Sequence, residues 1–237
     1  MSAERTDWPA LVVAAAQSAY SGHEDARRAA GAFAYMKEVA PFLGIDTPTR
    51  RRLLKAAWRD LPSPTSGELG RAALALMHRS EREYHYAAYD LITWYRKFAD
   101  AEFLPEFGAQ LLLTQPWWDT VDGLVTAAVS PLCREYGHAD LIDAWSESGD
   151  RWLIRAAIGH QRGWKSATNT ARVLQLCDRH WAEKEFFIAK AIGWALRDLA
   201  SLDGTAVVRF LRDHEQTRNT VATREALKGL RRGGFDV

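Results

Sequence analysis

The chain has few cysteines and no long apolar run. Of its 237 residues only two are cysteines, and Cys133 and Cys177 lack the paired spacing of a metal site. We therefore expect both to be buried, reduced thiols and not members of a disulfide framework. The longest early apolar stretch, Ala10 to Ala16, is too short to cross a membrane or to act as a clear signal segment. These absences predict a protein of the reduced cytoplasm that does not contact membranes.

An excess of charge of one sign is also missing, since 31 Lys and Arg residues are balanced by 30 Asp and Glu residues. A net charge of +1 does not by itself indicate a nucleic-acid binder, although basic residues can still gather on one surface. The sequence has no HExxH zinc motif, no phosphate-binding loop and no Gly-rich dinucleotide motif. Its serines lack the context of a nucleophile elbow. We therefore expect no metal and no cofactor.

Helical periodicity is present throughout, whereas the two-residue alternation of a β-strand is not. One helix is predicted over residues 11–19, with Pro9 in its first turn, and a second from Ala29 to Ala40. Short breaks of the length that joins neighbouring antiparallel helices follow at Gly44, 62–64, 148–149, Gly163 and 203–204. None is long enough for an interdomain linker. We therefore expect one all-α domain over residues 1–237.

An internal repeat runs through the predicted helices. Small residues recur 35, 34, 34 and 35 residues apart, at Ala88, Gly123, Ala157, Ala191 and Ala226. Such a period is typical of arrays of helical hairpins, in which each hairpin buries its apolar face only against its neighbours. The repeat therefore predicts a right-handed α-solenoid. Chance similarity among Ala-rich helices is the alternative.

The repeat also predicts that equivalent positions lie on one side of the array. Charged residues replace apolar ones in part of that face, since the position before the small residue carries Ala87, Asp122, Ala156, Lys190 and Glu225. Trp118 shares a helix face with Asp122, because the two are four residues apart. For Asp122 the alternatives to a functional role are a solvated face or an ion pair with an arginine of the next repeat. For Asp119, interaction with the positive end of its helix is the favoured interpretation.

Basic residues recur at helical spacing along the same array. Arg151 and Arg155 are four residues apart, with Asp150 before them as a candidate helix cap. The next repeat places Lys190, Trp194 and Arg197 on one stripe of a helix. Further basic stretches follow Thr47 and occupy the last repeat, and comprise Arg50, Arg51, Arg52, Lys55, Arg224, Lys228 and Arg231. Single basic residues mostly face solvent, but a row of them on the concave side of a solenoid would contact phosphates.

Several separated segments resemble one family. They are Tyr35-Met36-Lys37, Phe42 to Pro48, Trp117 to Asp122, Trp152 to Ile158 and Lys184 to Trp194. In order and spacing they are similar to the DNA alkylation repair glycosylases of the AlkD type, over most of the chain. That family is built from HEAT-like repeats, which agrees with the period. The resemblance implies a monomeric enzyme that acts on double-stranded DNA and hydrolyses the N-glycosidic bond of purines alkylated at N3 or N7.

The resemblance also implies roles for single residues. Asp122 matches the family's catalytic acidic residue, Trp118 and Trp194 match its cleft aromatics, and Arg155 matches its phosphate-contacting arginine. Arg162 and Lys165 are both candidates for the basic residue expected shortly after Arg155. The resemblance and the basic stripes together predict contacts with DNA for Tyr35, Thr47, Arg51, Arg151, Arg162, Lys190, Arg197 and Arg224.

These residue types suit the reaction. A purine alkylated at N3 or N7 is cationic and leaves without a proton donor, so the barrier lies in the oxocarbenium-like sugar. A carboxylate aimed at that sugar, here Asp122, stabilises the developing charge and can orient water. The faces of Trp118 and Trp194 attract cations, each by roughly 0.5–2 kcal/mol. The planar fork of Arg155 binds two phosphate oxygens. The sequence shows no dedicated base pocket, and the family works without enclosing the base.

A non-catalytic helical-repeat module that binds DNA structures or a protein partner is the alternative function. Helical arrays are commonly scaffolds, and some relatives of this fold lack the acidic residue and bind DNA without glycosylase activity. The presence of Asp122 favours an enzyme. A bifunctional lyase is less favoured, because Lys190 is the only lysine to consider as a Schiff-base nucleophile.

Overall fold

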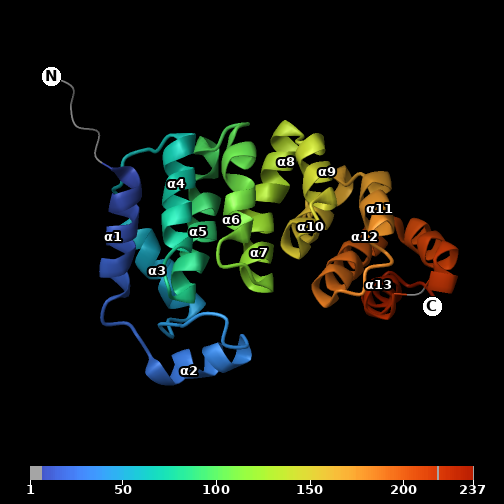
Figure 1. Ribbon diagram of the computed structural model, residues 1–237, viewed down its shortest axis with the longest axis horizontal. Coiled ribbons are helices and arrows are strands. Elements are labelled where there is room, and N and C mark those ends of the chain that lie inside the picture. The colour runs from blue at the N-terminus through green and yellow to red at the C-terminus, as the bar shows by residue number, and fades with distance from the viewer. Residues whose placement is uncertain (1–6, 218, 237) are drawn as a thin grey trace. The chain divides into compact units, whose positions relative to one another are not determined.

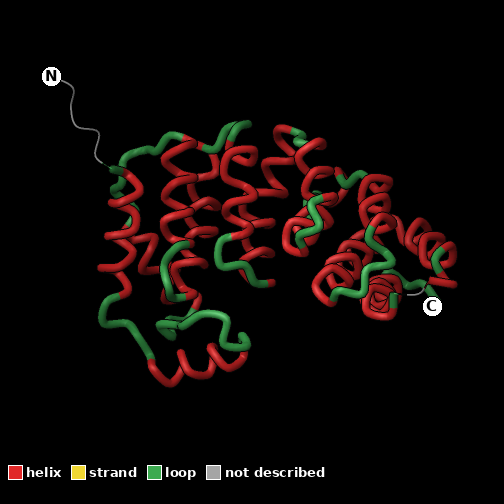
Figure 2. Tube along the Cα trace, viewed as in Figure 1, coloured by secondary structure: helices red, strands yellow, loops and turns green. Residues whose placement is uncertain are grey.

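The computed structural model describes residues 7–217 and 219–236, and within these ranges it contains helices and turns but no strand (Figures 1 and 2). The all-α fold class predicted from the sequence is confirmed. The chain divides into two compact units, residues 1–128 and 129–237. The single domain that we expected from the short loops stays a prediction.

The N-terminal unit is built from helices that pack on one another in pairs. Its helices are α1 (Trp8–Tyr20), α2 (Ala26–Tyr35), α3 (Thr47–Ala57), α4 (Ser66–Met77), α5 (Arg82–Tyr95), α6 (Ala109–Leu113) and α7 (Trp118–Leu124). Helix α1 packs against α3 and α4, α4 packs against α5, and α5 contacts α7. Helix α2 has no buried residue of its own, and Figure 1 shows it below the other helices of the unit.

The C-terminal unit repeats this pairing. Its helices are α8 (Ser130–Tyr136), α9 (Ala139–Glu147), α10 (Arg151–Ile158), α11 (Thr170–Arg179), α12 (Phe186–Asp213) and α13 (Thr220–Arg232). Helix α12 is the centre of the unit, because it packs against α10, α11 and α13. The two cysteines, Cys133 and Cys177, are buried free thiols, as expected. Burial raises the pKa of the Cys133 thiol to about 12, so it is not a reactive thiolate.

Polar side chains start most of these helices. Each accepts a hydrogen bond from a backbone N–H of the first turn, which would otherwise have no partner. The capping residues are Asp7, Asp25, Asp46, Thr65, Asp150, Asn169, Glu185 and Asn219. The cap predicted at Asp150 is confirmed. Pro9 lies in the first turn of α1, also as predicted.

Two predicted boundaries are wrong. The second helix ends at Tyr35 and does not continue to Ala40, because Lys37 and Glu38 both have φ of 60°, which no α-helix accommodates. The carboxylate of Glu83 binds the loop that follows. It accepts hydrogen bonds from three successive backbone N–H groups, those of residues 43–45, at 2.8–3.2 Å. The predicted loop at 203–204 is a kink inside α12, where Asp203 leaves helical geometry.

The repeat period is visible in the hydrogen bonds between side chains. The Ser146 hydroxyl bonds to the His180 ring over a separation of 34 residues. Lys190 bonds to Glu225 over a separation of 35 residues. Residues one period apart in the sequence are therefore neighbours in space, as stacked helical hairpins require. The prediction of helical repeats is confirmed.

Glycines allow α12 and α13 to come close to each other. A Cβ added to Gly229 would lie 2.6 Å from the backbone oxygen of Arg197. A Cβ added to Gly193 would lie 2.7 Å from the Cβ of Glu225 and 3.1 Å from the backbone of Ala222. Any larger residue at either position would force the two helices apart.

Replacing Gly229 with alanine tests this close approach. We expect Gly229→Ala to lower the free energy of unfolding by about 1–3 kcal/mol, because the new methyl group meets rigid backbone. Gly31→Ala is the matched control, since Gly31 lies in α2 with no atom within 4 Å of an added Cβ. The control should be neutral or stabilising by up to about 1 kcal/mol. Urea unfolding of both variants provides the measurement, and equal effects would contradict the packing argument.

Candidate functional site

Helix α7 carries the predicted catalytic pair of the N-terminal unit. Trp118 is its first residue and Asp122 lies one turn later, and both side chains are partly buried. The Thr120 hydroxyl accepts a hydrogen bond from the backbone N–H of Trp117 at 3.2 Å and so helps to start the helix. The short α7 therefore presents an aromatic ring and a carboxylate on the same side.

A buried ion pair fixes α7 against α5. The Arg82 guanidinium, 1% exposed, binds the carboxylate of Asp119 and donates a further bond to the backbone oxygen of Gln115 at 3.0 Å. The Tyr86 hydroxyl donates to the same carboxylate at 2.6 Å. Asp119 does lie in the first turn of α7, as the helix-end interpretation assumed. The ion pair was not predicted, and it makes Asp119 an anchor of the helix that carries Asp122.

A second contact brings α7 close to α5. A Cβ added to Gly123 would lie 2.4 Å from the ring of Tyr89, so only glycine fits at this repeat position. The sequence predicted a small residue here for close helix approach, and the structure confirms it. Asp122 stands directly before this contact, so the backbone that carries its side chain is firmly placed.

Helix α3 carries Arg51, a predicted DNA contact, next to the buried ion pair of Arg50 and Asp90. Arg50 is fully buried against Asp90 at 3.1 Å, although we expected the basic residues of this stretch to face solvent. Its guanidinium also lies over the rings of Tyr86 and Tyr89, 5.0 and 5.8 Å from their centroids. Arg51 pairs with the other oxygen of Asp90 at 3.0 Å but keeps half of its side chain exposed. The Asp90 carboxylate raises the pKa of Arg51, which is therefore a fixed cation at the surface.

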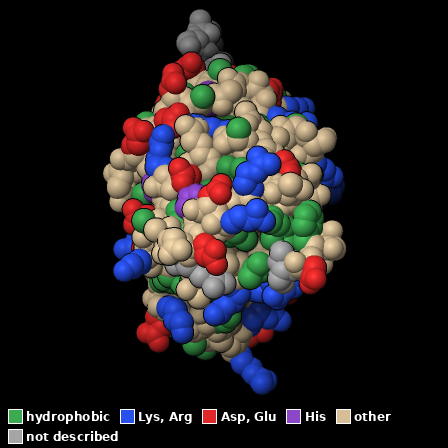
Figure 3. All heavy atoms as spheres, turned by 90° about the vertical axis from the view of Figure 1, so that its right-hand side faces the viewer, with side chains coloured by type: hydrophobic (Ala, Val, Ile, Leu, Met, Phe, Trp, Pro, Cys, Tyr) green, Lys and Arg blue, Asp and Glu red, His purple; other side chains and the backbone are tan. Residues whose placement is uncertain are grey.

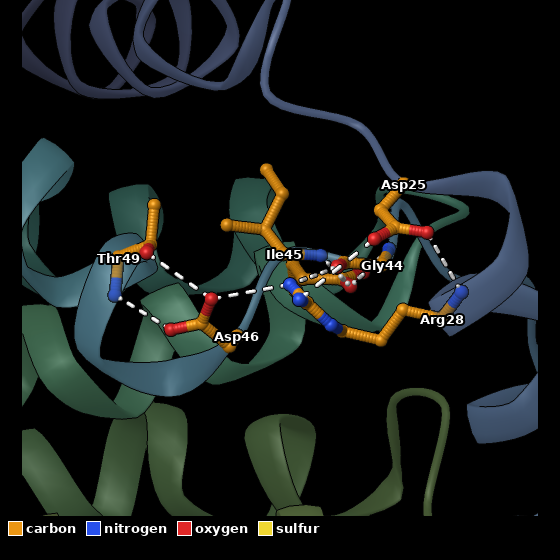
Figure 4. Close-up of polar contacts among 7 residues, drawn as sticks. Asp25, Arg28, Gly44, Ile45, Asp46 and Thr49 are labelled. Carbon is orange, nitrogen blue, oxygen red and sulfur yellow. Dashed lines mark hydrogen bonds and ion pairs between the residues drawn. The ribbon is translucent and has the colours of Figure 1, made fainter.

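The start of α3 is fixed by a small polar network (Figure 4). Asp46 accepts hydrogen bonds from the backbone N–H and the hydroxyl of Thr49, at 3.0 and 3.1 Å, and these lower the pKa of its carboxyl group. Arg28 of α2 reaches both Asp46 and the backbone oxygen of Gly44 at 3.1 Å. The network places Thr47, an exposed residue, at the first turn of α3.

In the C-terminal unit, four cations surround one tryptophan ring. The distances from the ring centroid of Trp194 are 4.9 Å for Arg155, 5.3 Å for Arg162, 5.5 Å for Lys190 and 5.7 Å for Arg197. We call these five residues the Trp194 cluster. On the face drawn in Figure 3, positive and negative side chains are mixed. The cluster is thus a local concentration of positive charge on a chain with almost no net charge.

Arg155 is the most deeply held member of the Trp194 cluster. It is 3% exposed, and one of its terminal nitrogens donates to the backbone oxygen of Phe187 at 2.7 Å. Of the two candidates for the basic residue after it, Arg162 lies over the Trp194 ring, whereas Lys165 stands exposed in a 3₁₀ turn. Arg162 is therefore the better candidate.

Glu225 of α13 connects three lysine and arginine side chains. Its carboxylate binds Lys190 at 2.8 Å, Lys228 at 3.0 Å and Arg197 at 3.3 Å. The hydrogen bond from Lys190 and the charges around it lower the pKa of Glu225 to about 2. Its side chain is only 7% exposed. A buried carboxylate thus lies directly beneath two members of the Trp194 cluster.

The structure brings some predicted site residues together and leaves others apart. Trp118 and Asp122 share α7, and the five members of the Trp194 cluster share one site in the C-terminal unit. Tyr35, at the end of α2, is 73% exposed. Arg151 is exposed and pairs with Glu185 at 3.3 Å, and Arg224 is exposed on α13. The prediction that the repeat sets residues of both units, Trp118 and Asp122 with Arg155 and Trp194, on one side of the array stays a prediction, because the two pairs belong to different units.

The sequence did not predict most of the charged residues that hold α7 and the Trp194 cluster in place. Arg50, Arg82, Asp90 and Glu225 are buried and Asp119 is partly buried, and for none of them was burial predicted. Their signal in the sequence was a pair of opposite charges separated by roughly one repeat. Among the described residues, no group of His, Cys, Asp or Glu could hold a metal ion. No helix in those same ranges is long and apolar enough to cross a membrane.

Comparison with known proteins shows the family to which the chain belongs. The family model for the DNA alkylation repair enzyme matches residues 16–230, which is most of the chain. The chain belongs to this family. A solved structure, a predicted DNA alkylation repair enzyme from Enterococcus faecalis, is 27% identical and aligns with a TM-score of 0.78, over 86% of this chain and 94% of that chain. No curated protein matches. The fold and the role in alkylation repair thus rest on both sequence and structure.

Breaking the buried ion pair under α7 should destabilise the N-terminal unit. We expect Asp119→Asn to lower the free energy of unfolding by about 3 kcal/mol, because it leaves the Arg82 charge buried without its partner. Tyr86→Phe removes one hydrogen bond to the same carboxylate and should cost only about 1 kcal/mol. Chemical unfolding of the two variants provides the comparison. Equal and small effects would mean that the ion pair does not anchor α7.

Proposed function

We propose that the protein is a monofunctional DNA glycosylase for cationic alkylpurines. It hydrolyses the N-glycosidic bond of purines alkylated at N3 or N7 in double-stranded DNA and leaves an abasic site. Family membership supports a role in alkylation repair. The observation that carries the more specific proposal is the partly buried Asp122, set one turn from Trp118 on a helix that a buried ion pair holds in place.

Asp122 is the residue to which we give the chemical role. An alkylated purine already carries its positive charge, so the enzyme needs no general acid for the leaving group. The charge that develops in the transition state lies on the sugar, and a preorganised carboxylate stabilises it and can orient the attacking water. Trp118 supplies an aromatic face for the cationic nucleotide. The anchoring of α7 keeps both side chains in place without reorganisation during the reaction.

The Trp194 cluster is better suited to an anion than to the cationic base. Four cations already lie within 5.7 Å of the Trp194 ring, so a fifth positive charge there would be repelled. We therefore give the cluster the role of binding a DNA phosphate. Arg155 and Arg162 bring planar guanidinium groups, which match the geometry of phosphate oxygens. Trp194 then serves as the surface on which these cations are arranged, in place of the nucleotide platform that the resemblance implied.

A non-catalytic DNA-binding or scaffolding module is the second candidate. It would explain the Trp194 cluster, whereas an acid such as Asp122 weakens binding to DNA and favours an enzyme. The monomeric state, the location in the cytoplasm and action without enclosing the base belong to the proposal as well.

Loss of the carboxylate at position 122 tests the mechanism. We expect Asp122→Asn to reduce the release of N7-methylguanine from duplex DNA by at least about 100-fold, because the sugar cation loses its counter-charge. DNA affinity should stay the same or rise, since a negative charge is removed. Asp60→Asn, an exposed acid of the same unit, is the control and should keep wild-type activity. Full activity of Asp122→Asn would disprove the assigned role.

Neutralising one cation of the Trp194 cluster tests the phosphate contact. We expect Arg162→Gln to weaken binding to damaged and undamaged duplexes alike. A plot of log affinity against log salt concentration has a negative slope, and this slope should become shallower by about 0.9, which corresponds to the loss of one phosphate contact. Arg209→Gln removes the same charge from an exposed position of the same unit and should leave the slope unchanged. If both variants change the slope equally, the cluster has no special contact with DNA.

A further inference from the structure

We propose that Glu225 is a positioning residue of the DNA-binding site. Its carboxylate holds Lys190 and Arg197 in the places from which they reach a DNA phosphate beside Trp194. The inference rests on the phosphate-binding role proposed for the Trp194 cluster, and it extends that role to a residue of a different helix, α13.

The contacts are specific to this carboxylate. One oxygen of Glu225 accepts from Lys190 at 2.8 Å and from Lys228 at 3.0 Å, and the other accepts from Arg197 at 3.3 Å. Lys190 and Arg197 are also the two cations of the Trp194 cluster that belong to α12, the helix that carries Trp194 itself. Each of these side chains is therefore held at two points, by the ring on one side and by the carboxylate on the other.

Close packing of the helices brings the carboxylate there. Gly193 and Gly229 let α13 approach α12 until the Cβ of Glu225 lies only 2.7 Å from the point at which a Cβ at position 193 would stand. Glu225 is also the repeat equivalent of Asp122 and follows Lys190 by one period of 35 residues. The repeat geometry thus turns a pair of equivalent positions into a direct contact.

A buried acid beneath a phosphate site needs an explanation in terms of charge. By itself an ionised carboxylate repels the DNA phosphates and lowers the affinity of the protein for DNA. With a pKa lowered to about 2, Glu225 is ionised at every pH at which duplex DNA is stable. Long flexible cations such as Lys190 gain from this arrangement, because their conformational freedom is restricted before DNA binds. Ordering of the cations accounts for the acid at this place, whereas bulk attraction does not.

The test separates positioning from bulk charge. Glu225→Gln keeps the size of the side chain and removes its charge, which raises the net charge by one. Asp198→Asn is the matched control, because Asp198 lies 3.8 Å from Arg197, is exposed, and loses the same charge. Both variants are measured as full-length proteins for affinity to an undamaged duplex over a range of salt concentrations. Release of N7-methylguanine and the midpoint of thermal unfolding are measured on the same samples.

Positioning predicts a result of opposite sign to that of bulk charge. For Glu225→Gln the negative slope of log affinity against log salt should become shallower by about 1, although the protein has become more positive. Base release should fall about tenfold, since displaced phosphate contacts misplace the substrate. Asp198→Asn should keep its slope and its activity. A slope for Glu225→Gln that is unchanged or steeper, as in the control, overturns the inference.

Two further arms keep the outcome clear. Glu225→Asp keeps the net charge but withdraws the carboxylate by one methylene group, so it should give the same shallower slope. It replaces Glu225→Gln if that variant fails to fold. If the wild-type protein releases no base, the proposed glycosylase activity fails. The binding measurements still decide the role of Glu225 in that case, because they use undamaged DNA and do not depend on catalysis.

Discussion

Close approach between the helices of successive repeats is the constraint on which the rest of the structure depends. At Gly123 the helix that carries Asp122 rests directly on the ring of Tyr89, and at Gly193 helix α12 rests on the backbone of α13. Where backbones come this near, polar side chains one period apart lie within bonding distance. The ion pairs that hold the candidate site, Arg82 with Asp119 and Lys190 with Glu225, follow from that spacing.

The two units use opposite charges in the same way. In the N-terminal unit, a buried cation, Arg82, lies beneath the helix that presents a carboxylate. In the C-terminal unit, a buried carboxylate, Glu225, lies beneath a surface that presents cations. In each case the buried charge fixes the element or the side chain for which we propose contact with DNA. This division suits a reaction in which a developing sugar cation and a phosphate anion must be bound by the same protein.

Much of this arrangement could be predicted from the sequence. The 34–35-residue period indicated the helical repeats, the small residue at Gly123 indicated close packing, and the four-residue spacing of Lys190 and Trp194 indicated one stripe. The buried charges could not be predicted in the same way, because single charged residues usually face solvent and burial depends on a partner in another repeat. The end of α2 was also missed, since Glu83, which binds the loop after it, lies about 40 residues away.

In the proposed mechanism the positive charge of the lesion drives its own excision. The most direct test is to compare base release from duplexes that contain N7-methylguanine with release from otherwise identical duplexes that contain the uncharged O6-methylguanine. If the charge of the lesion drives excision, the first duplex gives free N7-methylguanine and an abasic site, and the second gives no free base. Equal release from both duplexes, or no release from either, would contradict this mechanism.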